Sequence, residues 1–348
     1  MALPSTQKKW VIMGQEKGYD ELNFTDGPIP TVGDYGVLVK LHAASLNYRD
    51  HMIPKGTYIF HLHLPVVGGS DGAGEVIEVG PKVTKWKKGD RVTTLFNPGH
   101  QSGPMTRAIM RNGSIGGSFD GTWQQYGVYE ENWLVRLASN LSYLEGASLS
   151  DCGLTAWNAL YGLKAVKPGD WVLVQGTGGV SLFAIQFAKA GGAKVVATTS
   201  STSKYELLQR LGVDHIVNYS EDKDWGLTAR NFTPNEEGFA HILDVGGQET
   251  LPHSVKAIKP EGIVTVIGIL TGVETKNASI LDALLNTCTF RGIHIGSRDQ
   301  MDEMMAAIDA NKIQPVLDKR VFKLEELREG LEYMEARKHT GKVVIEIP

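Results

Sequence analysis

A strand, a glycine-rich turn and a helix follow one another in "DWVLVQGTGGVSLFAIQFAKA", residues 170–190, and this order constrains the fold more than any other feature. The apolar residues in the second half of the stretch recur with helical spacing. A second strand, "AKVVATT", and a second helix, "SKYELLQRLG", come next, and we expect Ser203 and Glu206 to form the capping box of that helix. Strands that alternate with helices predict a parallel sheet covered by helices on both faces.

The glycine-rich turn places Gly176, Gly178 and Gly179 between the strand and the helix. Gly176 permits a tight turn, and Gly178 lets the backbone approach a diphosphate bound at the helix N-terminus. Ser181 stands where a third glycine completes the motif, so we expect the strand and the helix to lie slightly further apart there. The spacing alone is weak evidence, but the order of strand, turn, helix and second strand predicts a dinucleotide site.

The residues after the second strand predict which dinucleotide is bound. An NAD site carries Asp or Glu there for the ribose hydroxyls, whereas this chain has "TSSTSK" at 199–204. A carboxylate would repel a 2′-phosphate, while hydroxyls and an ammonium group would bind it. We therefore predict NADP(H), with Ser200 and Lys204 near the phosphate and Tyr219 beside the adenosine. The alternative is that the serines only cap the next helix.

The residues before and after this α/β region have a different pattern. Residues 8–140 are short β-runs separated by glycines, which predict an antiparallel, barrel-like domain. A polar, glycine-rich segment at 97–121 is expected to form a long functional or mobile loop. The last predicted strand, "KVVIEI", is expected to return to the first domain.

Composition limits the classes of partner. The chain is 42% hydrophobic and 21% charged, as in soluble globular proteins, and its net charge of −4 predicts no nucleic-acid or anionic-membrane partner. No apolar run approaches the roughly 20 residues that span a bilayer, and the N-terminus does not resemble a secretory signal. Cys152 and Cys288 lie far apart in the sequence, which fits a reducing compartment. We therefore predict a cytoplasmic protein that acts on a small molecule.

Six segments together resemble the medium-chain dehydrogenase/reductase family over nearly the whole chain. They are "GSDGAGEVIEVG" at 69–80, "KKGDRV" at 87–92, "GLTAWNAL" at 153–160, "GTGGVS" at 176–181, "LGVDHIVNY" at 211–219 and the closing "GKVVIEI". The resemblance implies an α/β protein with a GroES-like antiparallel β-barrel catalytic domain at 1–150 and 298–348. It implies a doubly wound Rossmann domain that binds NADP at 151–297, a cleft between the domains, and a homodimer formed through the Rossmann sheets.

The resemblance also raises the question of zinc. Alcohol dehydrogenases of this family hold a catalytic zinc with Cys, His and Cys or Asp, and the corresponding positions here are Asn47, Ser70 and Asp151. One carboxylate among three positions does not make a zinc site, and we expect the neighbouring Cys152 to point elsewhere. The four cysteines of the family's structural zinc are absent from 97–121. The chain therefore resembles the zinc-free branch, similar to quinone oxidoreductases and enoyl-type reductases.

A different metal site could be built from the histidines of "RDHMIPKGTYIFHLH", which are His51, His61 and His63. Because Pro54, Gly56 and Pro65 indicate a loop, solvated or core histidines are the favoured interpretation.

The activity that these features predict is metal-free, NADPH-dependent reduction of an activated C=C bond or a quinone. Hydride addition places negative charge on oxygen, and the candidate hydrogen-bond donors are Asn47, Tyr48 and Tyr58. Asn47 could instead only end a strand, and Tyr48 could belong to the core. The expected cofactor contacts are Thr155, Gly176, Gly178, Gly179, Val180, Ser200, Lys204, Tyr219, Gly246, Gly268, Ile269, Leu270, Ser297 and Arg298.

Other interpretations stay open at this point. The aromatic residues Phe60, Phe96 and Trp123 could line the substrate site or fill the barrel core. The chain could reduce a ketone or an imine, or oxidise an alcohol, without zinc. It could also bind NADPH without catalysing a reaction.

Overall fold

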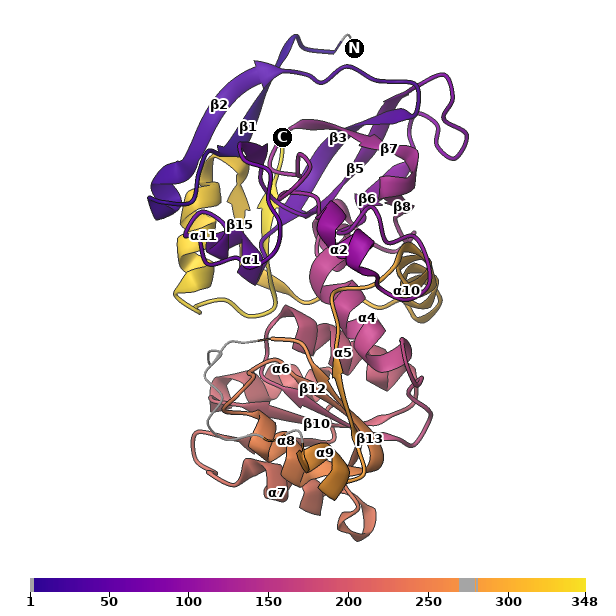
Figure 1. Ribbon diagram of the computed structural model, residues 1–348, viewed down its shortest axis with the longest axis vertical. Helices are drawn as coiled ribbons and strands as arrows, with labels where there is room; N and C mark the ends of the chain where they lie inside the picture. Colours follow the sequence, from indigo (N-terminus) through magenta and orange to yellow (C-terminus); the bar gives the residue numbers. More distant parts are fainter. Residues whose placement is uncertain (1–2, 269–278, 280) are drawn as a thin grey trace. The chain divides into compact units, whose positions relative to one another are not determined.

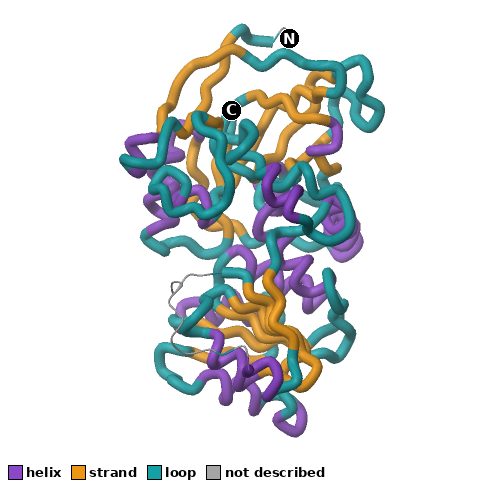
Figure 2. Tube along the Cα trace, in the orientation of Figure 1, coloured by secondary structure: helices purple, strands orange, loops and turns teal. Residues whose placement is uncertain are grey.

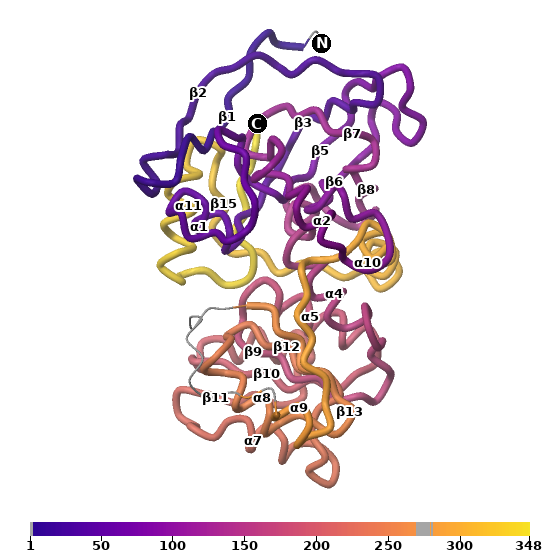
Figure 3. Tube along the Cα trace, viewed as in Figure 1, coloured from indigo at the N-terminus to yellow at the C-terminus, as the bar shows by residue number. Residues whose placement is uncertain are grey.

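The computed structural model describes residues 3–268, 279 and 281–348, and the chain divides into two compact units. The first unit consists of residues 1–154 and 295–348, and the second of residues 155–294. The domain boundaries predicted from the sequence lie after residue 150 and before residue 298. In Figures 1 and 3 the C-terminal segment, coloured yellow, returns to the indigo N-terminal unit, as expected for "KVVIEI".

The first unit contains two sheets among its described residues. The larger has the order β15-β16-β3-β5-β6-β8, with β7 also paired to β3, and the smaller has the order β2-β1-β4. All pairs are antiparallel except β15 with β16. The strands are β1 (Thr6–Ile12), β2 (Leu22–Pro28), β3 (Gly36–Ser45), β4 (Val66–Val67), β5 (Asp71–Val79), β6 (Arg91–Thr94), β7 (Tyr126–Glu130), β8 (Leu134–Arg136), β15 (Leu317–Lys323) and β16 (Lys342–Glu346).

Helices connect and flank these strands. The helices are α1 (Tyr48–Met52), α2 (Arg107–Asn112), α3 (Tyr143–Gly146), α10 (Arg298–Asn311) and α11 (Leu327–Glu335). The predicted long loop at 97–121 therefore contains a helix, α2, which begins where the Thr106 side chain accepts a hydrogen bond from the backbone N–H of Ile109. Sequence reasoning missed α2 because it has less than two turns and no apolar periodicity.

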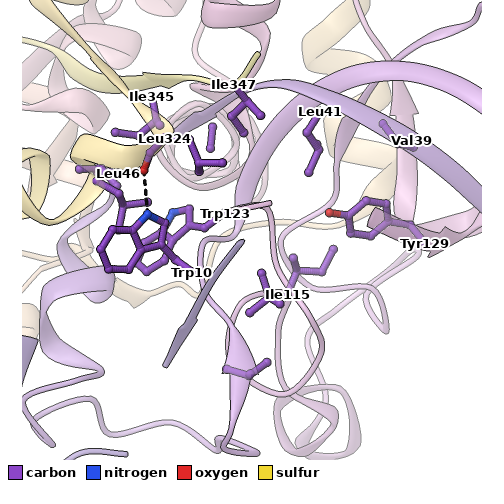
Figure 4. Packing of buried hydrophobic residues seen from close by; sticks show 14 of the residues in the cluster. Trp10, Val39, Leu41, Leu46, Ile115, Trp123, Tyr129, Leu324, Ile345 and Ile347 are labelled. Carbon is purple, nitrogen blue, oxygen red and sulfur yellow. Dashed lines mark hydrogen bonds between the residues drawn. The ribbon is translucent and has the colours of Figure 1, made fainter. Parts of the chain in front are cut away.

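The core of the first unit joins the two ends of the chain. The Trp10 indole N–H on β1 donates a 2.7 Å hydrogen bond to the carbonyl of Leu324, and Trp123 lies beside Trp10 (Figure 4). Trp123 is fully buried, and a Cβ on Gly68 would lie 2.3 Å from its ring, so this position requires glycine. Phe96 is also buried, so the core interpretation holds for Trp123 and Phe96.

The second unit is a parallel sheet with the order β11-β10-β9-β12-β13-β14 among its described residues, and Figure 2 shows its strands side by side among helices. The strands are β9 (Trp171–Gln175), β10 (Lys194–Thr199), β11 (His215–Asn218), β12 (Phe239–Asp244), β13 (Ile258–Val266) and β14 (Thr289–Gly292). The helices are α4 (Leu154–Tyr161), α5 (Gly179–Ala190), α6 (Tyr205–Arg210), α7 (Trp225–Asn231), α8 (Leu251–Ala257) and α9 (Leu281–Leu285). The predicted fold class, an antiparallel β domain with a parallel Rossmann sheet, is confirmed.

No helix within the described residues is long and apolar enough to cross a membrane.

Candidate functional site

Strand ends bring together polar residues that are distant in the sequence. In the first unit, β16 pairs antiparallel with β3 so that Val344 faces Ser45, and continuing this register places Lys342 opposite Asn47. Asp71, the first residue of β5, faces Ser45 from the other side of β3. A π-helical turn, Leu149–Gly153, adds Asp151 and Cys152. The sheet therefore builds one cluster from four separate segments.

Three hydrogen bonds and one ion pair link four residues of this cluster into a ring. The Lys342 ammonium donates to Oδ1 of Asn47, and Nδ2 of Asn47 donates to Oγ of Ser70 over 3.3 Å. The Ser70 hydroxyl donates to Oδ1 of Asp71 over 2.7 Å, and Oδ2 of Asp71 lies 3.9 Å from Nζ of Lys342. Oδ2 of Asp71 also accepts the backbone N–H of Asp151 at 3.1 Å. We call Lys342, Asn47, Ser70 and Asp71 the polar ring.

Opposite charges keep the buried ammonium of Lys342 ionised. Burial alone would lower the pKa of Lys342, but the interaction with the Cys152 sulfur and the negative charges of the Asp71 and Asp151 carboxylates outweigh burial and raise this pKa above its ordinary value. Burial raises the pKa of Cys152 to about 12, so its sulfur is a neutral thiol at neutral pH. Burial and the charge of Asp71 raise the pKa of Asp151 to about 7.

The residues at the three zinc-ligand positions do not fit a zinc ion. Asn47 and Ser70 bring an amide and a hydroxyl, which are poor zinc ligands beside thiolate and imidazole, and they are bonded to each other. The Lys342 ammonium is bound to the oxygen of Asn47, and a dication at that oxygen would be repelled by it. Within the described part of the chain, no group of three His, Cys, Asp or Glu side chains is arranged to hold a metal.

One sequence expectation about potential metal ligands, that for Cys152, is wrong. Cys152 was expected to point away from the cluster, but its sulfur lies 3.5 Å from Oδ1 of Asn47 and 3.8 Å from Nζ of Lys342. The π-helical turn explains the error, because it rotates the chain differently from a regular helix. His61 and His63 do meet, with their Nε2 atoms 2.8 Å apart on the surface, whereas His51 packs edge-on against Tyr48.

The three predicted catalytic residues lie in different surroundings. Asn47 is buried and caps α1, where its backbone N–H donates to Asp50 over 2.7 Å. Tyr48 is 45% exposed, so the alternative that it belongs to the core is wrong. Tyr58 is half-buried, with its ring 5.0 Å from the guanidinium of Arg49. Asn47 is therefore the one among the three that belongs to the polar ring.

In the second unit, the glycine-rich turn has the form that a diphosphate requires. Gly176 has a φ of +75°, which favours glycine, and an added Cβ on Gly176 or Gly178 would meet nothing within 4 Å. Gly178 precedes Gly179 and Val180, the first residues of α5, and no side chain caps the helix there. Ser181 is buried and donates a 2.7 Å hydrogen bond to the carbonyl of Gln175. The N-terminus of α5 can therefore receive an anion.

The predicted 2′-phosphate contacts follow β10. Ser200 is exposed, and the carbonyl of Ser200 accepts a 3.2 Å hydrogen bond from the hydroxyl of Ser220. Lys204 ends a 3-10 turn, Thr202–Lys204, and Tyr219 is 41% exposed beyond the end of β11. The predicted capping box of Ser203 with Glu206 is wrong. Ser201 caps the 3-10 turn by accepting from the N–H of Ser203, so the first turn starts two residues earlier.

The remaining cofactor candidates are divided between the two units. The hydroxyl of Thr155 is buried in α4 and has no hydrogen-bond partner among the described residues, which fits a ligand contact. Gly246 and Gly268 follow β12 and β13, and a Cβ on Gly268 would lie 2.3 Å from the carbonyl oxygen of Val245. Ile269 and Leu270 lie outside the described residues.

Ser297 and Arg298 have structural partners in the first unit. Ser297 caps α10 in a capping box with Gln300. The Arg298 guanidinium donates to the carbonyls of Asn132 and Leu134 over 3.0 and 2.8 Å. Their contact with a cofactor stays a prediction.

Sequence reasoning missed Lys342 as a member of the site. Its signal was weak, because a lysine that starts a strand is usually exposed and "GKVVIEI" indicated only that the strand returns to the first domain. The strand register that places Lys342 opposite Asn47, 295 positions earlier, is a tertiary property.

Two family models match the chain. The model of the alcohol dehydrogenase GroES-like domain matches residues 33–139, and that of zinc-binding dehydrogenases matches residues 179–310. A zinc-type alcohol dehydrogenase-like protein of Schizosaccharomyces pombe is 42% identical over 345 residues, which cover 97% of this chain and 99% of the relative.

Solved structures with the same fold cover almost all of the chain. A protein of Sinorhizobium meliloti described as an alcohol dehydrogenase has a TM-score of 0.91 and 35% identity, covering 99% of this chain and 100% of that one. A quinone oxidoreductase of Pseudomonas syringae has a TM-score of 0.79 and 26% identity, covering 98% and 99%.

Proposed function

The chain belongs to the medium-chain dehydrogenase/reductase family of oxidoreductases, and from this premise we propose that it reduces activated C=C bonds or quinones with NADPH and without zinc. NADPH would supply a hydride to the substrate. The protein would bind both molecules and stabilise the negative charge that develops on the substrate oxygen.

The polar ring is the observation that carries this proposal. At the positions where alcohol dehydrogenases are expected to hold zinc, Asn47 and Ser70 bond to each other, and Asn47 also binds the ammonium of Lys342. A site built in this way stabilises a developing oxyanion through hydrogen-bond donors and a fixed positive charge rather than through a Lewis acid. The Asn47 amide nitrogen carries two N–H groups, of which Ser70 accepts one, and we assign the other to the substrate oxygen.

The second unit supports NADPH as the cofactor. The N-terminus of α5 would hold the diphosphate, and Gly176 and Gly178 leave the backbone open to it. Beyond β10 the chain offers the hydroxyl of Ser200 and the ammonium of Lys204, where an NAD site would have a carboxylate. Thr155 would use its buried hydroxyl to contact the cofactor.

Reduction of a ketone or an imine, or oxidation of an alcohol, is the second candidate activity. It is supported by the S. pombe and S. meliloti relatives, which are described as alcohol dehydrogenases or as similar to them. Because a simple ketone is less electrophilic than an enone, it depends more on a metal ion or a proton donor. The metal-free donors of the polar ring therefore favour the enone or quinone.

We also propose a cytoplasmic homodimer formed through the Rossmann units. On α9, the exposed leucines 281, 284 and 285 offer an apolar surface. Cys152 and Cys288 are both free thiols, as in a reducing compartment.

One experiment tests the activity, the cofactor and the metal together. The purified protein is dialysed against a chelator, its metal content is measured by elemental analysis, and oxidation of NADPH and NADH is followed with matched enones, quinones, ketones and imines. We expect no stoichiometric zinc, and turnover of an enone or a quinone that prefers NADPH. Activity that needs zinc would contradict the proposal, as would reduction of ketones alone. Tight NADPH binding without turnover would indicate a non-catalytic NADPH-binding protein.

A further inference from the structure

The ammonium of Lys342 has a partner for each of its hydrogens. It donates to the carbonyl of Leu46 over 2.9 Å and to Oδ1 of Asn47. Its third side faces Sγ of Cys152 at 3.8 Å and Oδ2 of Asp71 at 3.9 Å. An ammonium group has three donors and no acceptor, so Lys342 has no further hydrogen bond to offer a substrate. Any effect of Lys342 on the reaction must therefore pass through its neighbours.

Asn47 is the neighbour whose chemistry Lys342 decides. A carboxamide has an oxygen and an NH₂ group of nearly equal size, and only its partners determine which way it points. The NH₂ group cannot face the ammonium of Lys342, since both are donors. The Ser70 hydroxyl already gives its hydrogen to Asp71, so towards Asn47 it can only accept. Both partners therefore select the same orientation, with Oδ1 towards Lys342 and Nδ2 towards Ser70.

We propose that Lys342 is a positioning residue, whose ammonium is the resident cation of the polar ring and fixes the Asn47 carboxamide with its N–H groups turned away from β16. This inference rests on the proposed function, in which an Asn47 N–H stabilises the substrate oxygen. Lys342 thus has two roles. It holds the N–H groups of Asn47 in place, and its ammonium occupies Oδ1 of Asn47, the atom that a metal ion would need as a ligand.

The cost of burying this group argues against a role in packing alone. The side chain of Lys342 is 3% exposed and that of Asp71 is 0% exposed, and the desolvation of two buried charges can cost more free energy than their attraction returns. An apolar residue at position 342 would anchor β16 beside β3 as well, but it would remove the charged partner of Oδ1 and leave the weaker hydrogen bonds with Ser70 and Cys152 to orient the Asn47 carboxamide.

A double-mutant cycle separates positioning from a structural role. Lys342→Met should lower kcat on the best enone or quinone by roughly tenfold or more and leave the KM for NADPH unchanged. In an Asn47→Ala background, the same Lys342→Met change should lower kcat by less than about twofold, because the group it positions is gone. Lys323→Met, which removes an exposed lysine of the same unit, is the matched control. If the two losses multiply, Lys342 does not act through Asn47 and the inference is wrong.

A charge-balanced variant guards against failure to fold. Lys342→Met alone leaves the buried carboxylate of Asp71 without its cation, whereas Lys342→Met/Asp71→Asn removes both charges together. This double variant should melt closer to the wild-type temperature than Lys342→Met and should still show the loss of kcat. Wild-type kcat in the folded double variant would overturn the inference.

A spectroscopic measurement decides the inference even if the proposed activity is not found. The side-chain ¹H–¹⁵N signals of Asn47 are identified as those lost in Asn47→Asp. In the wild type they should be well separated from free-amide positions and protected from exchange with solvent. In Lys342→Met, or in the charge-balanced variant, they should move towards free-amide positions and exchange faster, while Lys323→Met leaves them unchanged. Unaltered signals would contradict the positioning role, whatever the outcome of the activity assay.

Discussion

The hydroxyl of Ser181 donates a 2.7 Å hydrogen bond to the main-chain carbonyl of Gln175, the last residue of β9. This bond ties the first turn of α5 to the strand before it, at the position where the glycine motif usually has its third glycine. The buried serine is tolerated at this position because its hydroxyl has a hydrogen-bond acceptor, the Gln175 carbonyl at the end of β9. Ser181, which replaces the third glycine of the motif, therefore helps to hold the glycine-rich turn between β9 and α5.

We predict that Ser181→Ala lowers the free energy of unfolding by about 1 kcal/mol, because it removes a buried hydrogen bond and leaves the Gln175 carbonyl without this partner. Urea denaturation measures the change. Ser220→Ala removes a hydroxyl from an exposed 3.2 Å hydrogen bond in the same unit, and it should cost less than about 0.5 kcal/mol. Equal effects of the two substitutions would show that the Ser181 bond contributes nothing specific.

The second prediction concerns acid stability and Asp214, which precedes β11. Partial burial would raise the pKa of Asp214, but hydrogen bonds from Lys189, the Val195 N–H and Lys194 lower it to about 2. The unfolded chain binds the proton near pH 3.9, so this carboxylate stabilises the fold above that pH, and the stabilisation is lost as pH falls towards 2. After allowance for solvent screening, it amounts to about 1–2 kcal/mol at pH 7.

Asp214→Asn measures this contribution directly. Its destabilisation, taken from urea denaturation, should be full at pH 7, begin to shrink below about pH 4 and be small near pH 2. Asp26→Asn, which breaks an exposed ion pair with Lys8, should have little effect at any pH. A constant difference across this range would mean that the effect of Asp214→Asn is steric.

The sequence predicted best those features that local patterns determine. The parallel sheet followed from apolar strands that alternate with helices, and the turn at Gly176 followed from the glycines between them. The start of α6 was less well predicted. Ser200, Ser201 and Ser203 can each act as an N-cap, and which of them does so depends on where the chain leaves β10.

The polar ring could be predicted only in part. Asn47 and Ser70 were identified through the family resemblance, but Lys342 was not, because the register of β16 against β3 brings it to Asn47. Cys152 was excluded on the assumption of regular local structure, which the π-helical turn at Leu149–Gly153 breaks. Such contacts depend on strand pairing and on irregular backbone, neither of which has a local sequence signal.

The third prediction tests the choice of cofactor. Lys204→Ala should raise the KM for NADPH by roughly tenfold and leave the KM for NADH nearly unchanged, because it removes a charge-assisted contact to the 2′-phosphate. Lys167→Ala is the matched control. Lys167 is an exposed lysine that lies before the start of β9, whereas Lys204 lies after the end of the neighbouring parallel strand β10, so Lys167→Ala should change neither value. Equal losses with both cofactors would show that Lys204 supports the fold instead of binding phosphate.

The fourth prediction concerns the donors at the substrate oxygen. Asn47→Asp keeps an oxygen towards Lys342 and a cap for α1, but it removes both N–H groups. If Asn47 stabilises charge that appears only as the hydride arrives, kcat should fall by about 10²–10³, with little change in the KM of the substrate. Steady-state kinetics on the best enone or quinone gives both values.

Tyr48→Phe is the companion to this test, because Tyr48 is 45% exposed and its hydroxyl can be removed without disturbing the core. The variant should keep the wild-type free energy of unfolding and lose kcat by roughly tenfold if the hydroxyl supplies a proton or a second hydrogen bond. Chemical denaturation of Asn47→Asp and Tyr48→Phe separates a catalytic effect from a loss of folded protein. Should both folded variants retain wild-type kcat, neither Asn47 nor Tyr48 would be a donor to the substrate. The donors would then have to be sought at Ser70, Asp151 or Arg298.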